Sequence, residues 1–279
     1  MSHVTIPLAG VIGHPIAHSL SPRLHGYWLS ELGVSGFYVP LDVADDALPD
    51  VLASLPRMGF RGVNVTTPHK EAALVLANRA SARAKEIGAA NTLTFLADGG
   101  FEADNTDAFG FAENLRQEAP DWQPDAGPAV VLGAGGAARA ILSALITAGV
   151  PEIRLANRTR SRADALSDAF GPAVRVAEWS EAGAILEGAR TVVNTTTLGM
   201  ADGDRDFPVS LEAMSRDCLA TDIVYTPLET PFLRAAAARG ARTVDGLGML
   251  LHQGIPGFER WFGARPTVTE ALRQAVLAP

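Results

Sequence analysis

Short apolar runs alternate along the chain with segments of helical periodicity. Apolar runs that end in Gly, Asn, Thr or Asp predict strands, and apolar positions three and four residues apart predict helices. The predicted strands cover residues 4–13, 36–43, 59–66, 152–159, 173–179, 191–200, 218–225 and 241–246, with a further strand from residue 129. Helices are expected at 21–33, 45–59, from 68, at 107–120, up to 149, and at 246–263 and 267–279. Such alternation predicts an α/β fold.

Turn and cap residues refine this prediction. Ser21 is expected to cap the first helix, with Pro22 at its first position and Gly33 at its end. Thr67 and Pro68 suggest the same start for the helix that carries Lys70. Residues 91–105 predict a hairpin that turns at residues 98–100, and the polar, turn-rich residues 121–128 predict a boundary before a second folding unit.

Composition narrows the class of protein. Of the 279 residues 47% are hydrophobic, which is enough for one large core or two ordinary ones. The formal net charge of -8 argues against general binding to nucleic acids or to anionic membranes. The single cysteine, Cys218, excludes an internal disulfide framework, and no apolar run is long enough to span a bilayer. We therefore expect a soluble cytoplasmic protein.

Lysine is rare in this chain, and one of its two lysines stands in an unfavourable place. The cations are almost all arginines, and the two lysines are Lys70 and Lys85. Lys70 is expected in the first turn of a helix, where the helix dipole repels a positive charge. Lysine can lose its proton in a protein, whereas arginine cannot. Lys70 is therefore either a solvated surface lysine or a group that exchanges protons.

A glycine-rich turn predicts a dinucleotide site. The sequence GAGGAAR, residues 133–139, follows an apolar strand and opens a long helix, where backbone N–H groups can approach a pyrophosphate. An Asp or Glu after the next strand would favour NAD, but this chain has Asn157, Arg158 and Thr159 there, followed by Arg162. Two arginines and a hydroxyl can bind a 2′-phosphate, so the two motifs together favour NADP over NAD.

Polar residues at other strand ends predict a substrate site. Asn64, Asn91 and Asp107 each follow or begin near a predicted strand end. In an open α/β sheet such ends meet at one edge, so these side chains and Lys70 are expected to converge. Ser19 and Ser21 precede a helix, where two hydroxyls can either cap the helix or bind a small carboxylate.

The histidines give little support for a metal site. His14 and His18 flank Pro15 in an expected loop, and no neighbouring Cys or carboxylate completes a ligand set. His25 and His69 are expected to pack or to cap. We therefore predict no metal ion.

Eight ordered motifs resemble the shikimate dehydrogenase family, in its bacterial monofunctional form. They extend over nearly the whole chain and read HSLSPRLH, GVNVTTPHK, AANTL, DNTDAFGF, GAGGAAR, NRTRSR, DIVYTPLETPFL and DGLGMLLHQ. The resemblance implies the reversible NADP(H)-dependent reduction of 3-dehydroshikimate to shikimate, in the pathway to chorismate and the aromatic amino acids. It also implies two domains, a discontinuous α/β substrate domain of residues 1–107 and 246–279 and a Rossmann-type NADP-binding domain of residues 108–245.

The resemblance also implies a role for each matching residue. Lys70 and Asp107 match the catalytic pair, and Ser19, Ser21 and Tyr225 match the groups around the substrate carboxylate. The positions that match ring-hydroxyl ligands are Asn64, Thr66, Asn91, Asp107 and Gln253. The positions that match cofactor contacts are Gly133, Gly135, Gly136, Ala137, Asn157, Arg158, Thr159, Arg162, Gly246, Gly248 and Met249.

Two other functions remain open from the sequence. A quinate/shikimate or aminoshikimate dehydrogenase would share the fold, although Ser21 and the Asn157-Arg158-Thr159 segment favour shikimate and NADP. A non-catalytic NADP-responsive binding protein would have no need of both Lys70 and Asp107. The expected partner is a small-molecule substrate, and the resemblance allows either a monomer or a homodimer.

Overall fold

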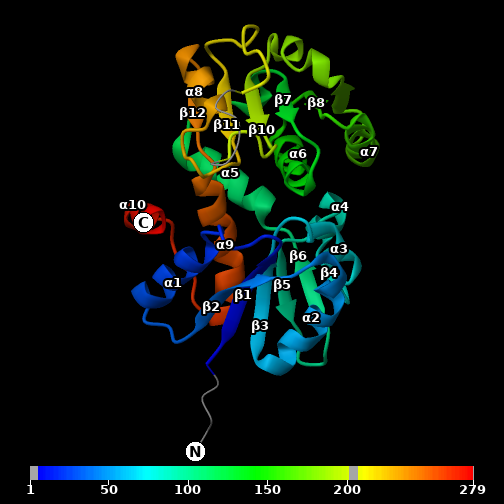
Figure 1. Ribbon diagram of the computed structural model, residues 1–279. Helices are drawn as coiled ribbons and strands as arrows, with labels where there is room; N and C mark the ends of the chain where they lie inside the picture. The colour runs from blue at the N-terminus through cyan, green and yellow to red at the C-terminus, as the bar shows by residue number, and fades with distance from the viewer. Residues whose placement is uncertain (1–5, 201–206, 279) are drawn as a thin grey trace, which may run out of the picture. The chain divides into compact units, whose positions relative to one another are not determined.

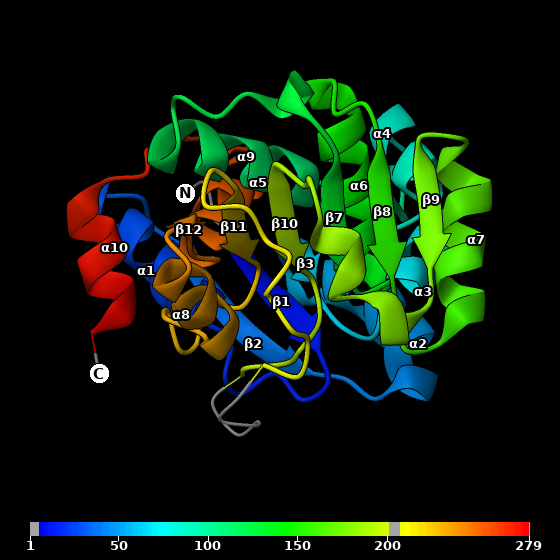
Figure 2. The ribbon, with the colours of Figure 1, turned by 90° about the horizontal axis from the view of Figure 1, so that it is seen from above.

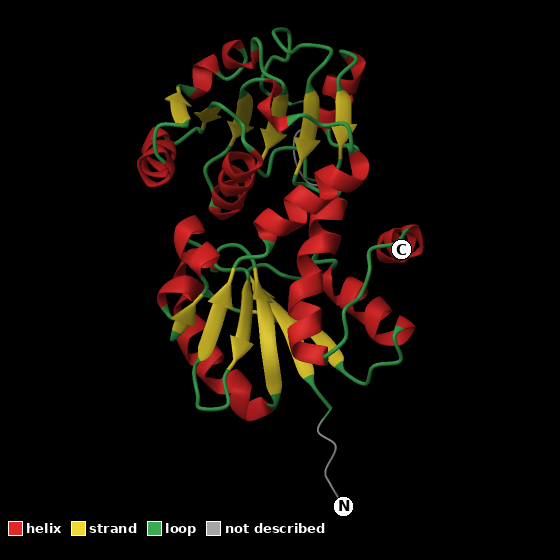
Figure 3. Cartoon of the chain, turned by 180° about the vertical axis from the view of Figure 1, so that it is seen from behind, coloured by secondary structure: helices red, strands yellow, loops and turns green. Residues whose placement is uncertain are grey.

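The computed structural model describes residues 6–200 and 207–278 (Figure 1). The chain divides into two compact units, one formed by Met1–Gly110 with Leu250–Pro279 and the other by Phe111–Met249. Each unit contains its own sheet flanked by helices, as the cartoon in Figure 3 shows. The predicted fold class, an α/β protein with a Rossmann-type domain and a discontinuous second domain, is confirmed.

The sheet of the first unit is mixed. Among the described residues it has the strand order β2-β1-β3-β5-β6-β4. Its strands are β1 (Leu8–Gly13), β2 (Phe37–Asp42), β3 (Phe60–Val65), β4 (Arg79–Ala80), β5 (Thr92–Phe95) and β6 (Phe101–Asp104). The parallel strands β2, β1 and β3 come first, and β5 runs antiparallel to both β3 and β6. The predicted hairpin is therefore confirmed as β5 and β6.

Alternating residues of this sheet face two different layers. Ile12, Val63 and Leu93 pack in a core with Leu48 and Leu52 of helix α2 (Leu48–Ser54). The remaining helices that begin before residue 110 are α1 (Ser21–Glu31), α3 (Lys70–Val75), α4 (Ala82–Ile87) and α5 (Asp107–Glu118).

The opposite layer is completed by the end of the chain. Ala9, Val11 and Tyr38 pack with Trp261 of helix α9 (Leu247–Phe262). A side chain at Gly62 would place Cβ 2.0 Å from Trp261 Nε1, so glycine is what lets this indole approach the sheet. Trp261 Nε1 donates to the Leu93 carbonyl at 3.1 Å.

Helix α10 (Glu270–Leu277) also returns to the first unit. Trp28 Nε1 of α1 donates to the Thr267 carbonyl at 3.1 Å, and the Arg23 guanidinium donates to the Ala278 carbonyl. Figure 1 shows α9 and α10 beside α1, although the two groups lie at opposite ends of the chain. The last helices therefore belong to the architecture of the first unit.

The sheet of the second unit is parallel throughout. Its order within the described residues is β12-β11-β10-β7-β8-β9, which can be followed across Figure 2. The strands are β7 (Ala129–Leu132), β8 (Ile153–Ala156), β9 (Val174–Ala177), β10 (Thr191–Asn194), β11 (Leu219–Asp222) and β12 (Arg242–Val244). The intervening helices are α6 (Gly136–Ala148), α7 (Arg160–Phe170) and α8 (Pro231–Ala238). Central strands β7 and β10 are completely buried, as expected for parallel strands covered on both faces.

Two predicted helix starts were wrong by one to two residues. Ser21 is the first residue of α1 and not its cap, because the N-cap position belongs to Leu20. The Ser21 N–H donates to Ser19 Oγ at 3.3 Å. Helix α3 begins at Lys70, not at Pro68. Residues 67–69 form a separate turn closed by a bond from His69 N to Thr66 O (3.0 Å) and held by the buried His69 ring, whose Nε2 lies 2.7 Å from the Val43 carbonyl.

None of the helices in the described part of the chain is both long and apolar enough to cross a membrane.

Candidate functional site

Lys70 and Asp107 form a close ion pair in the first unit. Each is the first residue of its helix, Lys70 of α3 and Asp107 of α5. Lys70 Nζ lies 2.5 Å from Asp107 Oδ2, and the exposed fractions of the two side chains are 13% and 1%. Lysine at a helix start opposes the helix dipole, so the buried carboxylate is the group that compensates its charge. The pair keeps a partly accessible ammonium next to a fixed carboxylate.

Asn91 connects this pair to the last helices. Asn91 Nδ2 donates to Asp107 Oδ1 (2.8 Å) and to Gln253 Oε1 (3.0 Å). Asn91 Oδ1 accepts from the Thr106 N–H at 2.7 Å, which fixes the orientation of the amide. The Thr106 hydroxyl in turn donates to the Gln253 carbonyl at 3.0 Å. Residues far apart in sequence thus form one hydrogen-bonded cluster.

Asn64 joins the same cluster from the end of β3. Asn64 Nδ2 donates to the Asn91 carbonyl (3.0 Å) and to Thr92 Oγ1 (3.2 Å). Its Oδ1 accepts a hydrogen bond of 2.7 Å from the Tyr38 hydroxyl. The structure therefore brings together Lys70, Asn64, Asn91 and Asp107, and adds Gln253 to them.

Ser19 and Thr66 lie on loops of the first unit, and Ser21 is the first residue of α1. Ser21 is buried, whereas Ser19 and Thr66 are half-buried. The loops after β1 and β3 are linked by a bond of 3.2 Å from the His14 N–H to the Thr67 carbonyl. A Cβ at Gly13 would lie 2.6 Å from Thr66 Cγ2, so the two loops approach closely. The loops after β1 and β3, one of which carries Thr66, therefore lie side by side.

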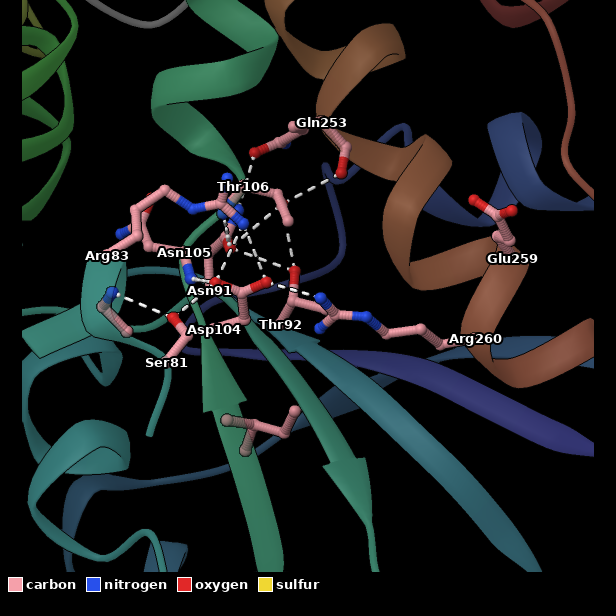
Figure 4. A network of polar contacts seen from close by, with 12 residues as sticks. Ser81, Arg83, Asn91, Thr92, Asp104, Asn105, Thr106, Gln253, Glu259 and Arg260 are labelled. Carbon is pink, nitrogen blue, oxygen red and sulfur yellow. Dashed lines mark hydrogen bonds and ion pairs between the residues drawn. The ribbon is translucent and has the colours of Figure 1, made fainter. Parts of the chain in front are cut away.

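A second ion-pair network supports the loop between β6 and Asp107. Figure 4 shows the buried Asp104, at the end of β6, between groups from α4 and α9. Arg83 Nη2 contacts both carboxylate oxygens at 2.9 and 3.0 Å, Arg260 Nη2 lies 2.6 Å from Oδ2, and the Ser81 hydroxyl donates to Oδ1 at 2.7 Å. Burial acts to raise the pKa of Asp104, but Ser81, Arg260 and Arg83 outweigh it and hold that pKa below its ordinary value.

This network continues directly into the loop. Asp104 Oδ1 accepts from the Asn105 N–H at 2.8 Å, and Asn105 Oδ1 accepts from the Asp107 N–H at 3.0 Å. The position of Asp107 therefore depends on Asp104. Tyr38, Asp104 and Arg260 are not among the site residues that the sequence predicts. A signal existed for Arg260, which is a charge within the apolar segment 246–263.

The glycine-rich turn of the second unit is shaped for close approach. Gly133 has φ +110°, and a Cβ there would lie 2.6 Å from Thr195 Oγ1. A Cβ at Gly135 would meet nothing within 4 Å, so this residue faces open space. Helix α6 begins at Gly136 without a side-chain cap, and Ala137 follows in its first turn. The free N–H groups at this helix start fit a pyrophosphate.

Asn157 ties the turn to the end of β8. Its Oδ1 accepts from the Ala134 N–H at 3.2 Å, and its Nδ2 donates to the Thr159 carbonyl at 2.8 Å. Thr159 stands at the N-cap position of α7 but makes no side-chain cap bond, so its hydroxyl is not used as a cap.

The arginines that follow Asn157 differ in their pairing. Arg160 is bound to both Asp164 and Glu178. Arg158 and Arg162 are exposed, and neither has a carboxylate partner among the described residues. These two guanidinium groups can therefore bind a phosphate without breaking an ion pair.

The remaining predicted residues lie in the second unit. Tyr225 is half-buried after β11, whereas Ser19 and Ser21 belong to the first unit. A Cβ at Gly246 would lie 2.5 Å from the Ile223 carbonyl, and one at Gly248 would lie 1.9 Å from Asn114 Oδ1. Met249 is buried. The absence of side chains at both glycines lets the start of α9 pass close to β11 and α5.

His14, one of the histidines that are predicted not to bind metal, lies beside a carboxylate. His14 Nδ1 lies 2.7 Å from Asp42 Oδ1 on the surface. Within the described residues no group of three or more His, Cys, Asp or Glu side chains could hold a metal ion.

Comparisons with protein-family models place three segments of this chain. Residues 11–93 match the shikimate dehydrogenase substrate binding domain, and residues 118–199 match the family described as shikimate / quinate 5-dehydrogenase. Residues 246–277 match the shikimate 5'-dehydrogenase C-terminal domain.

Named relatives are similar over almost the entire chain. The shikimate dehydrogenase (NADP(+)) of Cereibacter sphaeroides is 64% identical, over 99% of this chain and 99% of the relative. The enzyme of the same name from Paracoccus denitrificans is 60% identical, over 98% of this chain and 96% of the relative.

Solved structures of related proteins have a similar fold over almost the entire chain. The shikimate 5-dehydrogenase of Thermus thermophilus, in complex with NADP(H) and shikimate, has a TM-score of 0.85 and 42% identity, covering 96% of this chain and 98% of that one. The quinate dehydrogenase of Corynebacterium glutamicum, in complex with NAD, has a TM-score of 0.88 and 31% identity, covering 97% and 98%.

Proposed function

Because the chain belongs to the shikimate dehydrogenase family, we propose that it catalyses the reversible NADP(H)-dependent reduction of 3-dehydroshikimate to shikimate. The observation that carries this proposal is the Lys70–Asp107 pair, with its Nζ–Oδ2 distance of 2.5 Å in a cluster of amide and hydroxyl groups. Bound NADPH supplies the hydride. The chain itself has to bind the substrate, stabilise charge on its oxygen and move one proton.

Lys70 is the proton donor in reduction. A ketone that accepts hydride develops negative charge on its oxygen, and a protonated Lys70 beside that oxygen stabilises the charge and then gives up its proton. In the reverse direction neutral Lys70 accepts the proton of the hydroxyl. Asp107 holds the ammonium in place and compensates its charge in both directions.

The surrounding groups bind the rest of the substrate. We assign Ser19, Ser21 and Tyr225 to the carboxylate, and the assigned ligands of the ring hydroxyls are Asn64, Thr66, Asn91, Asp107 and Gln253. The hydrogen-bonded cluster around Asn91 supports these assignments, because it presents fixed donors and acceptors at the ends of β3, β5 and β6. Such fixed groups recognise a polyhydroxylated ring at low entropic cost.

The second unit supplies the cofactor site. We assign the pyrophosphate to Gly133, Gly135, Gly136 and Ala137, and the 2′-phosphate to Asn157, Arg158, Thr159 and Arg162. Gly246, Gly248 and Met249 are assigned to the nicotinamide side. The lack of ion pairs at Arg158 and Arg162 among the described residues, in contrast to Arg160, supports NADP over NAD.

We further propose that residues 1–107 with 246–279 act as the substrate domain and residues 108–245 as the NADP domain. A cytoplasmic location is supported by the presence of a single cysteine, Cys218, because one thiol cannot form the internal disulfides typical of oxidising compartments. The Cys218 thiol is buried, and burial raises its pKa to about 12, so it is unreactive. The net charge of -8 supports small-molecule partners and not nucleic acid.

The decisive experiment is the initial rate of NADP⁺ reduction by the purified protein with shikimate, beside quinate and beside NAD⁺. We expect fast turnover only when shikimate and NADP⁺ are supplied together, and not when quinate replaces shikimate or NAD⁺ replaces NADP⁺. Comparable rates with quinate or NAD⁺ would indicate a broader quinate/shikimate dehydrogenase. NADPH binding without turnover of any substrate would contradict an enzymatic role and favour a binding protein.

A further inference from the structure

The Tyr38 hydroxyl lies within the substrate cluster but has no step in the proposed reaction. Tyr38 is on β2, and 8% of the residue is exposed. Its hydroxyl donates to Asn64 Oδ1 at 2.7 Å. Burial raises the pKa of Tyr38 well above its ordinary value, against the opposing effect of a hydrogen bond with the Ser21 side chain. A phenol in this environment keeps its proton, so it remains a donor to Asn64.

The partners of Asn64 determine what this amide can still offer. The Asn91 carbonyl can only accept, so the Asn64 atom facing it at 3.0 Å must be Nδ2. The other Nδ2 hydrogen is directed to Thr92 Oγ1, at 3.2 Å. Tyr38 then occupies one of the two lone pairs of Oδ1. A single lone pair remains, so Asn64 can accept a hydrogen bond from a ligand but cannot donate one.

The Tyr38 ring is held by a stack. The imidazole of His25 lies parallel to it, with ring centroids 3.8 Å apart and an interplanar angle of 2°. Burial lowers the pKa of His25 to about 3, so the imidazole is neutral, and its Nδ1 has no hydrogen-bond partner among the described residues. Trp261 of α9 packs near the same ring, with centroids 6.3 Å apart. These contacts fix where the hydroxyl points.

The geometry points to Tyr38 as a positioning residue that sets substrate specificity through Asn64. Its hydroxyl fixes the Asn64 amide at Oδ1 and leaves one lone pair of that oxygen for a ligand, and it contacts Ser21, the serine assigned to the substrate carboxylate. The inference rests on the proposed function. The site therefore selects a polyhydroxylated carboxylate that presents a hydroxyl hydrogen to Asn64, because a keto or ether oxygen there would face an acceptor without a proton between them.

The test is the substitution Tyr38→Phe, which removes one oxygen and keeps the stacked ring. Loss of a hydrogen bond to a positioned group corresponds to about a 5- to 10-fold change. We expect the KM for shikimate to rise by about that factor, while kcat and the KM for NADP⁺ stay within about twofold. Tyr27→Phe is the matched control, because the Tyr27 hydroxyl contacts Glu31 on the surface of α1 at 3.3 Å. Its kinetics should equal those of the parent.

A double-mutant cycle with Asn64→Ala separates positioning from general stability. If Tyr38 acts through Asn64, Tyr38→Phe adds little to the KM once Asn64 is absent. If the KM effects of the two substitutions multiply in the double mutant, or if Tyr38→Phe leaves the KM unchanged, the inference about Tyr38 is wrong. The proposed function would not be affected by either result. A parent protein that does not turn over shikimate would overturn the proposed function, and the inference with it.

Discussion

At the scale of single residues, the choice of lysine over arginine at position 70 carries a chemical requirement. The chain uses arginine for almost all its cations, and Lys70 and Lys85 are its only lysines. Arginine could also pair with Asp107 and stabilise an oxyanion, but it could not exchange a proton at neutral pH. The position of Lys70 beside a buried carboxylate fits a group that does both.

The first prediction concerns Lys70. Lys70→Ala should lower kcat by about 100- to 10,000-fold, which is the usual contribution of a positioned acid or base. Lys70→Arg should be nearly as slow because it keeps the charge and loses the proton exchange. NADPH affinity, measured by fluorescence titration, should change little in both variants. Lys85→Arg, at an exposed position, is the control, and near-normal turnover in Lys70→Arg would disprove the assignment.

The second prediction concerns the two arginines without a carboxylate partner among the described residues. Replacing Arg158 and Arg162 together by Gln should weaken NADPH binding by about 10- to 100-fold, since charge-assisted hydrogen bonds to phosphate contribute about 1.5–3 kcal/mol. Binding of NADH, which lacks the 2′-phosphate, should be almost unchanged. Arg160→Gln is the matched control, because Arg160 is already paired with Asp164 and Glu178. An equal loss of NADH and NADPH affinity would contradict the 2′-phosphate site.

Part of the site was predictable at this scale, and part was not. Asn64 and Asp107 could be expected to converge because the carboxyl ends of β3 and β6 lie at one edge of the sheet. Asn91 lies at the same edge for another reason, since it precedes β5, which runs antiparallel to both strands. Tyr38 could not be predicted in this way. Side chains on β2 alternate between the two faces of the sheet, and the local sequence does not indicate which polar group the Tyr38 hydroxyl will contact.

At the scale of elements, the missed helix starts have a common cause. Ser, Thr and Pro favour both caps and tight turns, so a Thr-Pro pair predicts a change of direction more reliably than the first residue of a helix. In this chain the bond from His69 N to Thr66 O closes a turn before α3 begins. The buried His69 side chain stabilises this turn and so decides between a turn and an earlier helix start. Its partner, the Val43 carbonyl, is 26 residues away in sequence.

The third prediction concerns the link between α9 and β6. Asp104 has a folded-state pKa below its ordinary value of 3.8, so its stabilising effect is complete above that value and is lost as pH falls through the folded-state pKa. Arg260→Gln removes one of its cations and raises the pKa of Asp104. Acid unfolding should then begin at higher pH, and the free energy of unfolding at pH 7 should fall by about 1–2 kcal/mol.

Urea unfolding between pH 3 and 7 measures both effects. Arg265→Gln is the control on the same stretch of chain, because Arg265 pairs with the exposed Glu259 and such pairs contribute little. Identical stability profiles of the two variants would show that Arg260 is an ordinary surface cation.

At the scale of the whole molecule, the local sequence pattern predicts the type of secondary structure but not which distant elements pack together. The alternation of strands and helices predicted α/β structure in both units. The return of α9 and α10 to the first unit was expected only from the resemblance to a known family, because bonds such as Trp261 to Leu93 connect residues 168 positions apart. No periodicity within a short window contains such a contact.

The fourth prediction tests the division of labour between the units. Hydrogen exchange with saturating NADP⁺ should slow in peptides from residues 133–162. Shikimate should instead slow exchange in peptides that contain Lys70, Asn91 and Asp107, and in a separate peptide around Tyr225. At about 100 times Kd a ligand adds about 2.7 kcal/mol, which is about a 100-fold slowing of exchange at amides that open only after the ligand has dissociated. Protection by shikimate confined to 133–162 would contradict the assignment.

The split first unit also has a consequence for protein synthesis. A ribosome makes residues 1–110 early, but Gln253, Arg260 and Trp261, which complete their hydrogen bonds, emerge only after the whole of residues 111–249. Domains fold as units during synthesis, so the inserted unit is complete while the surrounding one, which already has its strands β1–β6, still lacks α9 and α10. A nascent chain halted before α9 would therefore contain the glycine-rich turn in a finished sheet, while Lys70 and Asp107 still lacked the helix that closes their cluster. The order of translation makes the first unit, the proposed substrate domain, the last part of this molecule to be completed.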